Sequence, residues 1–191
     1  VALIGVTTPG TLVSSTPRFF QDEKGHFIYG FCEDKAGVKL YRQVQDTVEE
    51  AREQGADTVI LVAHLGSDGS IPVWSSRALL AHVTGVDGLI DGHSHEQYEV
   101  FYPDRNGKMI PVAQTGTKLQ SLGRMVIEDD GTIRGELVRE LMEPDPQVEK
   151  LVRKEMAKVD RALSQKVGES SVELVDSLEG QRAVRQKETN L

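Results

Sequence analysis

Three histidines stand at two similar places in this chain, and their type and spacing suit metal binding. His64 follows the apolar run Val-Ile-Leu-Val-Ala and is followed by leucine and glycine. His93 and His95 lie in the segment Leu-Ile-Asp-Gly-His-Ser-His, where a second apolar stretch ends. In an extended backbone, residues i and i+2 project to the same side, so these two imidazoles can face one small volume. Their nitrogen atoms suit transition metals better than calcium.

The elements around the histidines are expected to bring them together. A helix over roughly residues 75–83 separates the two apolar stretches, which gives the order strand, helix, strand. A right-handed crossover would make the two strands parallel, with both carboxyl ends at one edge of a sheet. Ligands of open α/β sheets bind at that edge. Gly66 and Gly92, which lack a Cβ, would let the chain turn sharply beside a bound group.

Two carboxylates lie close to the histidines in the sequence. Asp91 could accept a hydrogen bond from an imidazole and fix its tautomer, or it could simply end a strand. Asp68 could reach the metal edge from the polar loop 67–72, although such loops commonly use aspartate as a turn residue. Neither His26 nor His82 is expected to bind metal, because the first lies in a polar loop and the second flanks the buried face of a helix.

These motifs, taken in order, resemble those of a known superfamily. Residues 92–95, with Ala-His-Leu-Gly upstream, resemble the last two motifs of the calcineurin-like metallophosphoesterases. The surroundings resemble the bacterial group of 5′-nucleotidases, UDP-sugar hydrolases and 2′,3′-cyclic-nucleotide phosphodiesterases. Residues 4–9 are similar to the IGLTTP segment of that group, and residues 112–116 to its QAG-like strand. Residues 185–191 resemble the opening of its second, nucleoside-binding domain, which makes Asn190 a candidate for substrate binding.

The resemblance implies a two-metal centre with zinc, manganese or cobalt. His64 and His93 match positions that hold the second metal, and His95 matches one that holds the first. The family's other ligands, including its catalytic histidine, lie upstream in Asp-x-His, Gly-Asp and Gly-Asn-His segments, and none of these precedes His64 in this sequence. We therefore expect the carboxyl half of a catalytic domain, with no catalytic residue of its own. As it stands, such a fragment should bind metal weakly or not at all and should be inactive.

For the parent protein, the resemblance implies hydrolysis of nucleotide phosphoesters by a metal-activated water. Its partners would be the nucleotide substrate, the missing amino-terminal half and the missing carboxyl-terminal domain. The resemblance also implies a periplasmic, cell-wall or extracellular location. Two alternatives remain open: a metallophosphoesterase relative with another phosphoester substrate, and a non-catalytic binding or scaffolding domain with structural histidines.

Composition narrows the class of protein further. The 191 residues carry a net charge of −8, which argues against a nucleic-acid partner because such binding needs clustered basic residues. No apolar run approaches the length of about 18 residues that spans a membrane, so no membrane span is expected. Cys32 is the only cysteine, which excludes an internal disulfide.

Hydrophobic periodicity predicts an α/β fold. The resemblance adds a partial metallophosphoesterase sandwich, with mixed sheets flanked by helices. Two successive hairpins around Asn-Gly and Asp-Gly predict an antiparallel meander that extends or faces the first sheet. The expected elements are a buried strand over 1–6, a short strand or extended segment over 27–31, a helix over 38–55, a strand over 58–63, and hairpins over 97–113 and 122–141.

Three regions are expected along the chain. Residues 1–143 would form the carboxyl half of the catalytic domain. Residues 144–168 would form a linker helix that begins with a capping aspartate, Asp145, and a proline. Residues 169–191 would form an extended tail, the start of a missing nucleoside-binding domain. The apolar stripe of the linker helix makes a homodimer a further candidate partner.

Overall fold

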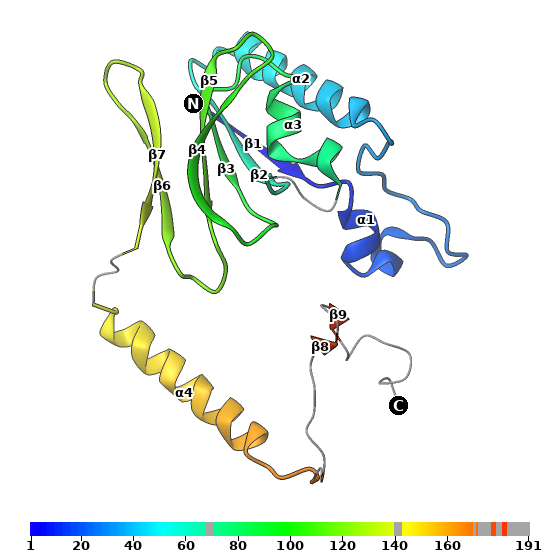
Figure 1. The fold of residues 1–191 in the computed structure, drawn as a ribbon, viewed down its shortest axis with the longest axis vertical. Helices are drawn as coiled ribbons and strands as arrows, with labels where there is room; N and C mark the ends of the chain where they lie inside the picture. The colour runs from blue at the N-terminus through cyan, green and yellow to red at the C-terminus, as the bar shows by residue number, and fades with distance from the viewer. Residues whose placement is uncertain (68–70, 140–142, 170, 172–176, 179–180, 183–191) are drawn as a thin grey trace. The chain divides into compact units, whose positions relative to one another are not determined.

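The computed structural model describes residues 1–67, 71–139, 143–169, 171, 177–178 and 181–182. The chain divides into two compact units, Val1–Leu141 and Met142–Leu191, and each is considered by itself. Figure 1 shows the elements of both. The histidine motifs belong to the first unit.

A five-stranded mixed sheet forms the centre of the first unit, in the order β1-β2-β3-β5-β4. The first four strands in that order run parallel, and β4 is antiparallel to β5 at the edge (Figure 1). The carboxyl ends of β2 and β3 therefore meet at one edge, as the histidine spacing predicts. The strands are β1 (Ala2–Thr7), β2 (Val59–His64), β3 (Gly88–Asp91), β4 (Gln97–Pro103) and β5 (Met109–Thr115).

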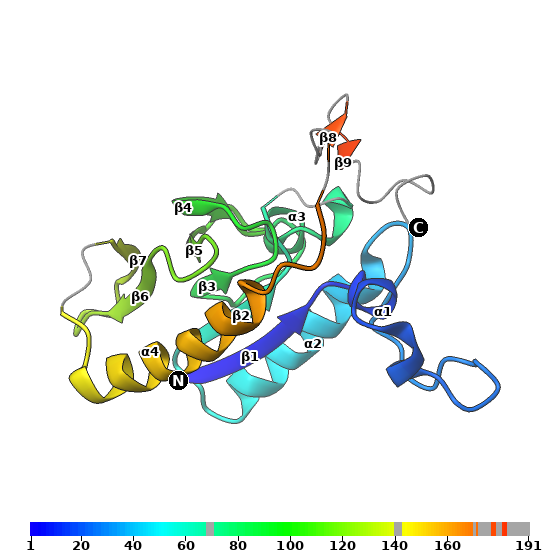
Figure 2. The same ribbon diagram turned by 90° about the horizontal axis from the view of Figure 1, so that it is seen from below.

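Helix α2 (Val38–Glu53) lies against one face of this sheet, beside β1 and β2 (Figure 2). Its buried residues recur at helical spacing and pack on the apolar residues of β2 and β3. The carboxylate of Asp34 accepts hydrogen bonds from three backbone N–H groups at the start of the helix. Because those groups have no partner within a helix, this contact fixes where α2 begins.

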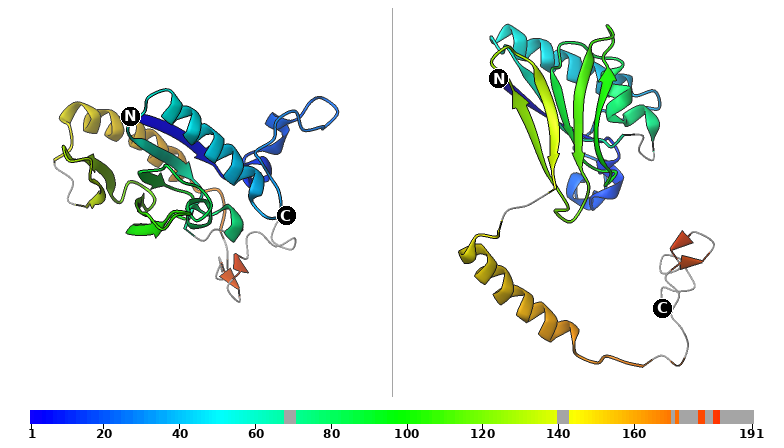
Figure 3. Two further views of the ribbon diagram at one scale, coloured as in Figure 1. Left: turned by 90° about the horizontal axis from the view of Figure 1, so that it is seen from above. Right: turned by 60° about the vertical axis from the view of Figure 1, so that its left-hand side comes forward.

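A second hairpin covers part of the opposite face of the sheet. Strands β6 (Leu122–Ile127) and β7 (Ile133–Val138) pair only with each other and pack over β5 and β3 (Figure 3). A Cβ on Gly88 would lie 2.6 Å from the sulfur of Met125, so this glycine makes room for the hairpin. The result is a mixed α/β sandwich, which confirms the predicted fold class.

The remaining elements of the first unit are short. The expected helix over 75–83 is only five residues long, because the chain leaves it in a turn before Gly85, whose φ is +81°. These elements are α1 (Thr11–Ser14), η1 (Pro17–Phe20), η2 (Pro72–Trp74) and α3 (Ser76–Leu80).

One expectation about the amino-terminal part is wrong. The strand expected to be buried is the edge strand β1, and its Leu3 side chain is 70% exposed. The segment 27–31, for which a short strand or an extended segment was expected, forms no regular strand. Phe27 makes an isolated bridge with Gln21, and the N–H of Ile28 donates to the carbonyl of Phe20. Phe27, Ile28 and Tyr29 are exposed, whereas the half-buried Phe31 contacts the ring of Phe20.

The second unit contains helix α4 (Pro146–Leu163), within the range predicted for a linker helix. Asp145 caps it by accepting hydrogen bonds from the N–H groups of Gln147 and Val148. A two-strand hairpin follows, formed by β8 (Ser177–Leu178) and β9 (Gln181–Arg182). Among the described helices, none is long and apolar enough to cross a membrane.

Candidate metal centre at the carboxyl edge of the sheet

The fold brings His64 and His93 together. His64 is the last residue of β2, and His93 follows the end of β3, the neighbouring parallel strand. Their ring centres lie 5.0 Å apart, with an interplanar angle of 65°. Two imidazoles that share one tetrahedral metal, each at about 2.1 Å through a ring nitrogen, would have ring centres roughly 5 Å apart. The distance between the two rings is therefore compatible with a shared metal ion, and it is also that of an edge-to-face ring contact.

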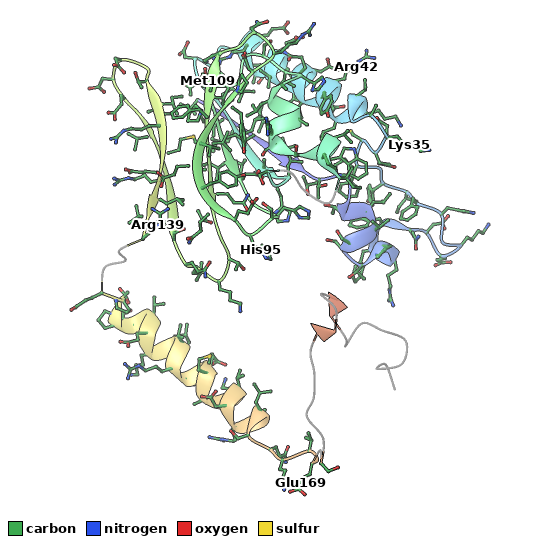
Figure 4. All side chains as sticks on the ribbon, in the orientation of Figure 1. Lys35, Arg42, His95, Met109, Arg139 and Glu169 are labelled. Atoms are coloured by element: carbon green, nitrogen blue, oxygen red, sulfur yellow. The ribbon has the colours of Figure 1, made fainter. Side chains whose placement is uncertain are left out.

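The backbone around His95 differs from the extended segment that we expected. His93 has a φ of +81° and His95 a φ of +60°, so both lie in the left-handed region. The alternation of side chains along a strand does not apply to such a backbone. Figure 4 shows His95 at the end of the sheet opposite Met109, where β5 begins.

The third histidine is near the other two without completing a site. His95 is close enough for its charge to lower the pKa of His93. Within the described part of the chain, however, no group of three His, Cys, Asp or Glu side chains is arranged to hold a metal ion. The structure thus joins two of the three predicted ligands.

The environment of His93 favours a neutral ring. Burial lowers its pKa most, and the nearby charges of His64 and His95 lower it further, while Asp91 opposes them. A neutral imidazole keeps a lone pair for a metal ion, whereas a protonated one does not. The electrostatics are therefore compatible with nitrogen ligation by this residue.

Asp91 holds the backbone of the site. One oxygen of its carboxylate accepts hydrogen bonds from the N–H groups of Leu65 (3.0 Å), Gly66 (3.1 Å) and Gly92 (2.8 Å). The other oxygen accepts one from the hydroxyl of Tyr98 at 3.1 Å. From the sequence, we considered that Asp91 could accept a hydrogen bond from an imidazole. In the structure, it instead accepts hydrogen bonds from backbone N–H groups just after His64 and just before His93.

The two predicted glycines lie where the loops approach each other most closely. Gly66 has a φ of +82°, and a Cβ there would meet the side chain of Ser94 at 3.2 Å. A Cβ on Gly92 would lie 3.1 Å from Nδ1 of His64. The other two candidates, Asp68 and Asn190, lie outside the described residues.

Sequence reasoning missed a set of polar residues behind the histidines. Gln114 is fully buried, and it contacts Ser94, Glu96 and Tyr98. In the sequence, Gln114 could have been recognised only as the polar residue that directly follows the apolar run ending at Ala113. Such a residue in a buried strand needs partners, but the sequence does not say which ones.

A cavity of about 160 Å³ opens beside His93. Its walls combine the loop after β1 with Leu65 and Trp74, so they are mainly apolar. The residues that line it are Thr8, Gly10, Val13, Ser14, Leu65, Ile71, Trp74 and His93. The cavity gives the candidate metal edge a small space for part of a ligand.

This chain is similar to known proteins both in sequence and in fold, while no family model matches it. The chain is 25% identical over 205 residues to the trifunctional nucleotide phosphoesterase protein YfkN of Bacillus subtilis, and it spans 12% of that protein. It shares its fold with the NAD nucleotidase NadN of Haemophilus influenzae, with a TM-score of 0.57 and 16% identity. That likeness covers 86% of this chain and 40% of the nucleotidase. The protein matched by sequence is a nucleotide phosphoesterase and the one matched by fold is a nucleotidase, in agreement with the resemblance that the histidine motifs of this chain suggest.

Proposed function

We propose that this chain supplies the carboxyl half of the catalytic domain of a metal-dependent nucleotide phosphohydrolase. The observation that carries the proposal is the facing pair of His64 and His93, with ring centres 5.0 Å apart at the end of two parallel strands. The activities for which the two similar proteins are named, those of a nucleotide phosphoesterase and an NAD nucleotidase, support a nucleotide as substrate.

The residues of this chain would bind and orient rather than transfer protons. His64 and His93 would donate ring nitrogens to one divalent cation, and His95 would hold a second one nearby. Bound cations of this kind activate water and neutralise charge on phosphoryl oxygens. Asp91 would keep the two histidine loops at a fixed separation through its backbone contacts. Imidazole ligands favour zinc, manganese or cobalt over calcium.

The rest of the site would come from other parts of a longer polypeptide. With three of the seven ligands that the family resemblance implies, this chain alone should hydrolyse nothing. An exported location, in the periplasm, the cell wall or outside the cell, is part of the same proposal and rests on the resemblance alone.

Metal titration of the isolated chain tests the central claim. We expect zinc or manganese to bind the unmodified chain, and His64→Ala and His93→Ala to weaken that binding by at least about tenfold. His82→Ala is the matched control, because that histidine stacks on Tyr41 and bonds to the carbonyl of Ala78. If His64→Ala and His93→Ala bind metal as tightly as the unmodified chain and His82→Ala do, the histidines are structural and a scaffolding role replaces the enzymatic one.

Substrate class needs the full-length parent protein. Its hydrolysis of AMP, UDP-glucose and 2′,3′-cyclic AMP should exceed that of a sugar phosphate without a base. Equal rates on all of them would favour a metallophosphoesterase with a different substrate.

A further inference from the structure

Gln114 is the most deeply buried polar side chain close to the histidines. It has no exposed surface and lies on β5, between β3 and β4. Its amide oxygen accepts a hydrogen bond from the N–H of Glu96 at 3.1 Å. Its amide nitrogen donates to the hydroxyls of Ser94 (3.0 Å) and Tyr98 (3.0 Å). One side chain thus binds both neighbours of His95.

The segment that Gln114 holds has an unfavourable backbone conformation. His93 and His95 both have positive φ, which costs free energy for any residue with a Cβ. Such a conformation persists only where surrounding contacts fix it. The contacts at Ser94 and Glu96 flank His95 directly, so Gln114 is well situated to do this.

Glu96 adds a second attachment for the same turn. Its carboxylate accepts hydrogen bonds from the hydroxyl of Ser94 at 2.7 Å and from that of Ser67. Ser67 belongs to the loop after β2, three residues beyond His64. The loop of His64 and the turn of His95 are therefore joined on this side as well.

Tyr98 connects Gln114 to Asp91. Its hydroxyl accepts from the amide of Gln114 and donates to the carboxylate of Asp91. Asp91 in turn holds the backbone beside His64 and His93. A continuous set of polar contacts consequently reaches the backbone next to all three imidazoles.

We propose that Gln114 is a positioning residue, which holds the turn from His93 to Glu96 in its strained form and so sets where the His95 ring lies. This inference rests on the proposed metal site at His64 and His93. Gln114 acts on the turn that carries His93 and His95, whereas Asp91 fixes the backbone just after His64 and at Gly92 through contacts of its own.

The test compares two glutamines that differ in position. Gln114→Met keeps most of the side-chain volume and removes the polar contacts. Gln45→Met is the matched control, because Gln45 also makes two bonds to one backbone segment, at Thr84, and lies on helix α2. Hydrogen exchange of the backbone amides, measured by NMR without metal, reports on the turn itself, and zinc titration reports on the site.

We expect Gln114→Met to speed exchange of the Glu96 amide at least tenfold and to weaken zinc binding by about 10- to 100-fold. Gln45→Met should change neither. Equal exchange and equal zinc affinity in the two variants would overturn the positioning role. If His64→Ala binds zinc as tightly as the unmodified chain, the proposed function fails, and the exchange rate of the Glu96 amide still decides the role of Gln114.

A second variant covers the case in which Gln114→Met does not fold. Tyr98→Phe keeps the ring and removes only the hydroxyl that links Gln114 to Asp91. It should speed exchange at Glu96 by a smaller factor than Gln114→Met and leave His64 and His93 in contact. Unchanged exchange at Glu96 in Tyr98→Phe, with a folded chain, would also count against the proposal.

Discussion

Asp87 and Asp91 lie at opposite ends of strand β3 and bind different kinds of partner. Asp87, just before the strand, receives bonds from Lys108 at 2.6 Å, from the N–H of Val59 at 2.9 Å and from Arg52. Asp91, the last residue of the strand, binds three backbone N–H groups and a tyrosine hydroxyl. The ion pairs of Asp87 stabilise the sheet. The backbone contacts of Asp91 shape the candidate metal site.

The ion pairs of Asp87 predict a dependence of stability on pH. Burial raises the pKa of this carboxyl, but the bonds from Lys108, Val59 and Arg52 outweigh burial and lower it overall. A carboxyl whose pKa is lower in the folded chain stabilises the fold above its ordinary pKa of about 4, and that stabilisation is lost as the pH falls further. Asp87→Asn should reduce the free energy of unfolding at pH 7 by about 1–3 kcal/mol.

Urea denaturation at pH 7 and at pH 3 checks this prediction. The loss of stability between the two values should be smaller in Asp87→Asn than in the unmodified chain. Asp46→Asn is the control, because its pair with Arg42 is exposed at 3.9 Å and should contribute less than about 0.5 kcal/mol. The same acid dependence in Asp87→Asn and the unmodified chain would contradict the assignment.

The sequence predicted the elements with strong periodicity and missed those that depend on neighbours. Strands β2 and β3 stand out as apolar runs, and α2 stands out by its helical stripe. The edge location of β1 could not be predicted, because an apolar run has the same sequence pattern in an edge strand with one neighbouring strand as in a central strand with two. The backbone around His95 could not be predicted for another reason. Alternating side chains require an extended backbone, whereas His93 and His95 both have positive φ. Gln114 was recognised only as part of a motif, since its partners are distant in the sequence.

Two adjacent residues of β2 should differ sharply in their contribution to stability. Leu61 is completely buried against the helix side, whereas Val62 is 44% exposed on the other face. Leu61→Ala removes buried methyl groups and leaves a cavity, so it should cost about 2–5 kcal/mol. Val62→Ala should cost less than about 1 kcal/mol, because water already reaches that side chain. Urea denaturation measures both, and similar losses would mean that the assigned faces of β2 are reversed.

The exposed edge of the sheet predicts self-association. Strand β1 is outermost, has no charged residue or proline, and exposes Leu3 to 70%. Natural edge strands usually carry such residues because an open edge can pair with another chain. Leu3→Lys should therefore lower the apparent mass at high concentration in sedimentation or light scattering. Leu119→Lys is the control, since Leu119 is 90% exposed outside the strands, and an equal effect there would point to general surface hydrophobicity.

Gly66 should affect metal binding through the distance between the two histidine loops. Its φ of +82° favours glycine, and a Cβ there would press on Ser94, which lies between His93 and His95. Gly66→Ala should thus destabilise the fold by about 1–3 kcal/mol and also move the turn that carries two candidate ligands. We expect weaker zinc binding, measured by calorimetric titration of the folded variant.

Gly55 separates the backbone effect from the contact with Ser94. It has a φ of +90°, and a Cβ there would meet nothing within 4 Å. Gly55→Ala should therefore carry a similar backbone cost while leaving zinc affinity unchanged, because it lies after α2 and away from the histidines. If the two variants lower zinc affinity equally, the loss reflects global stability, and the close approach of the loops plays no part in forming the site.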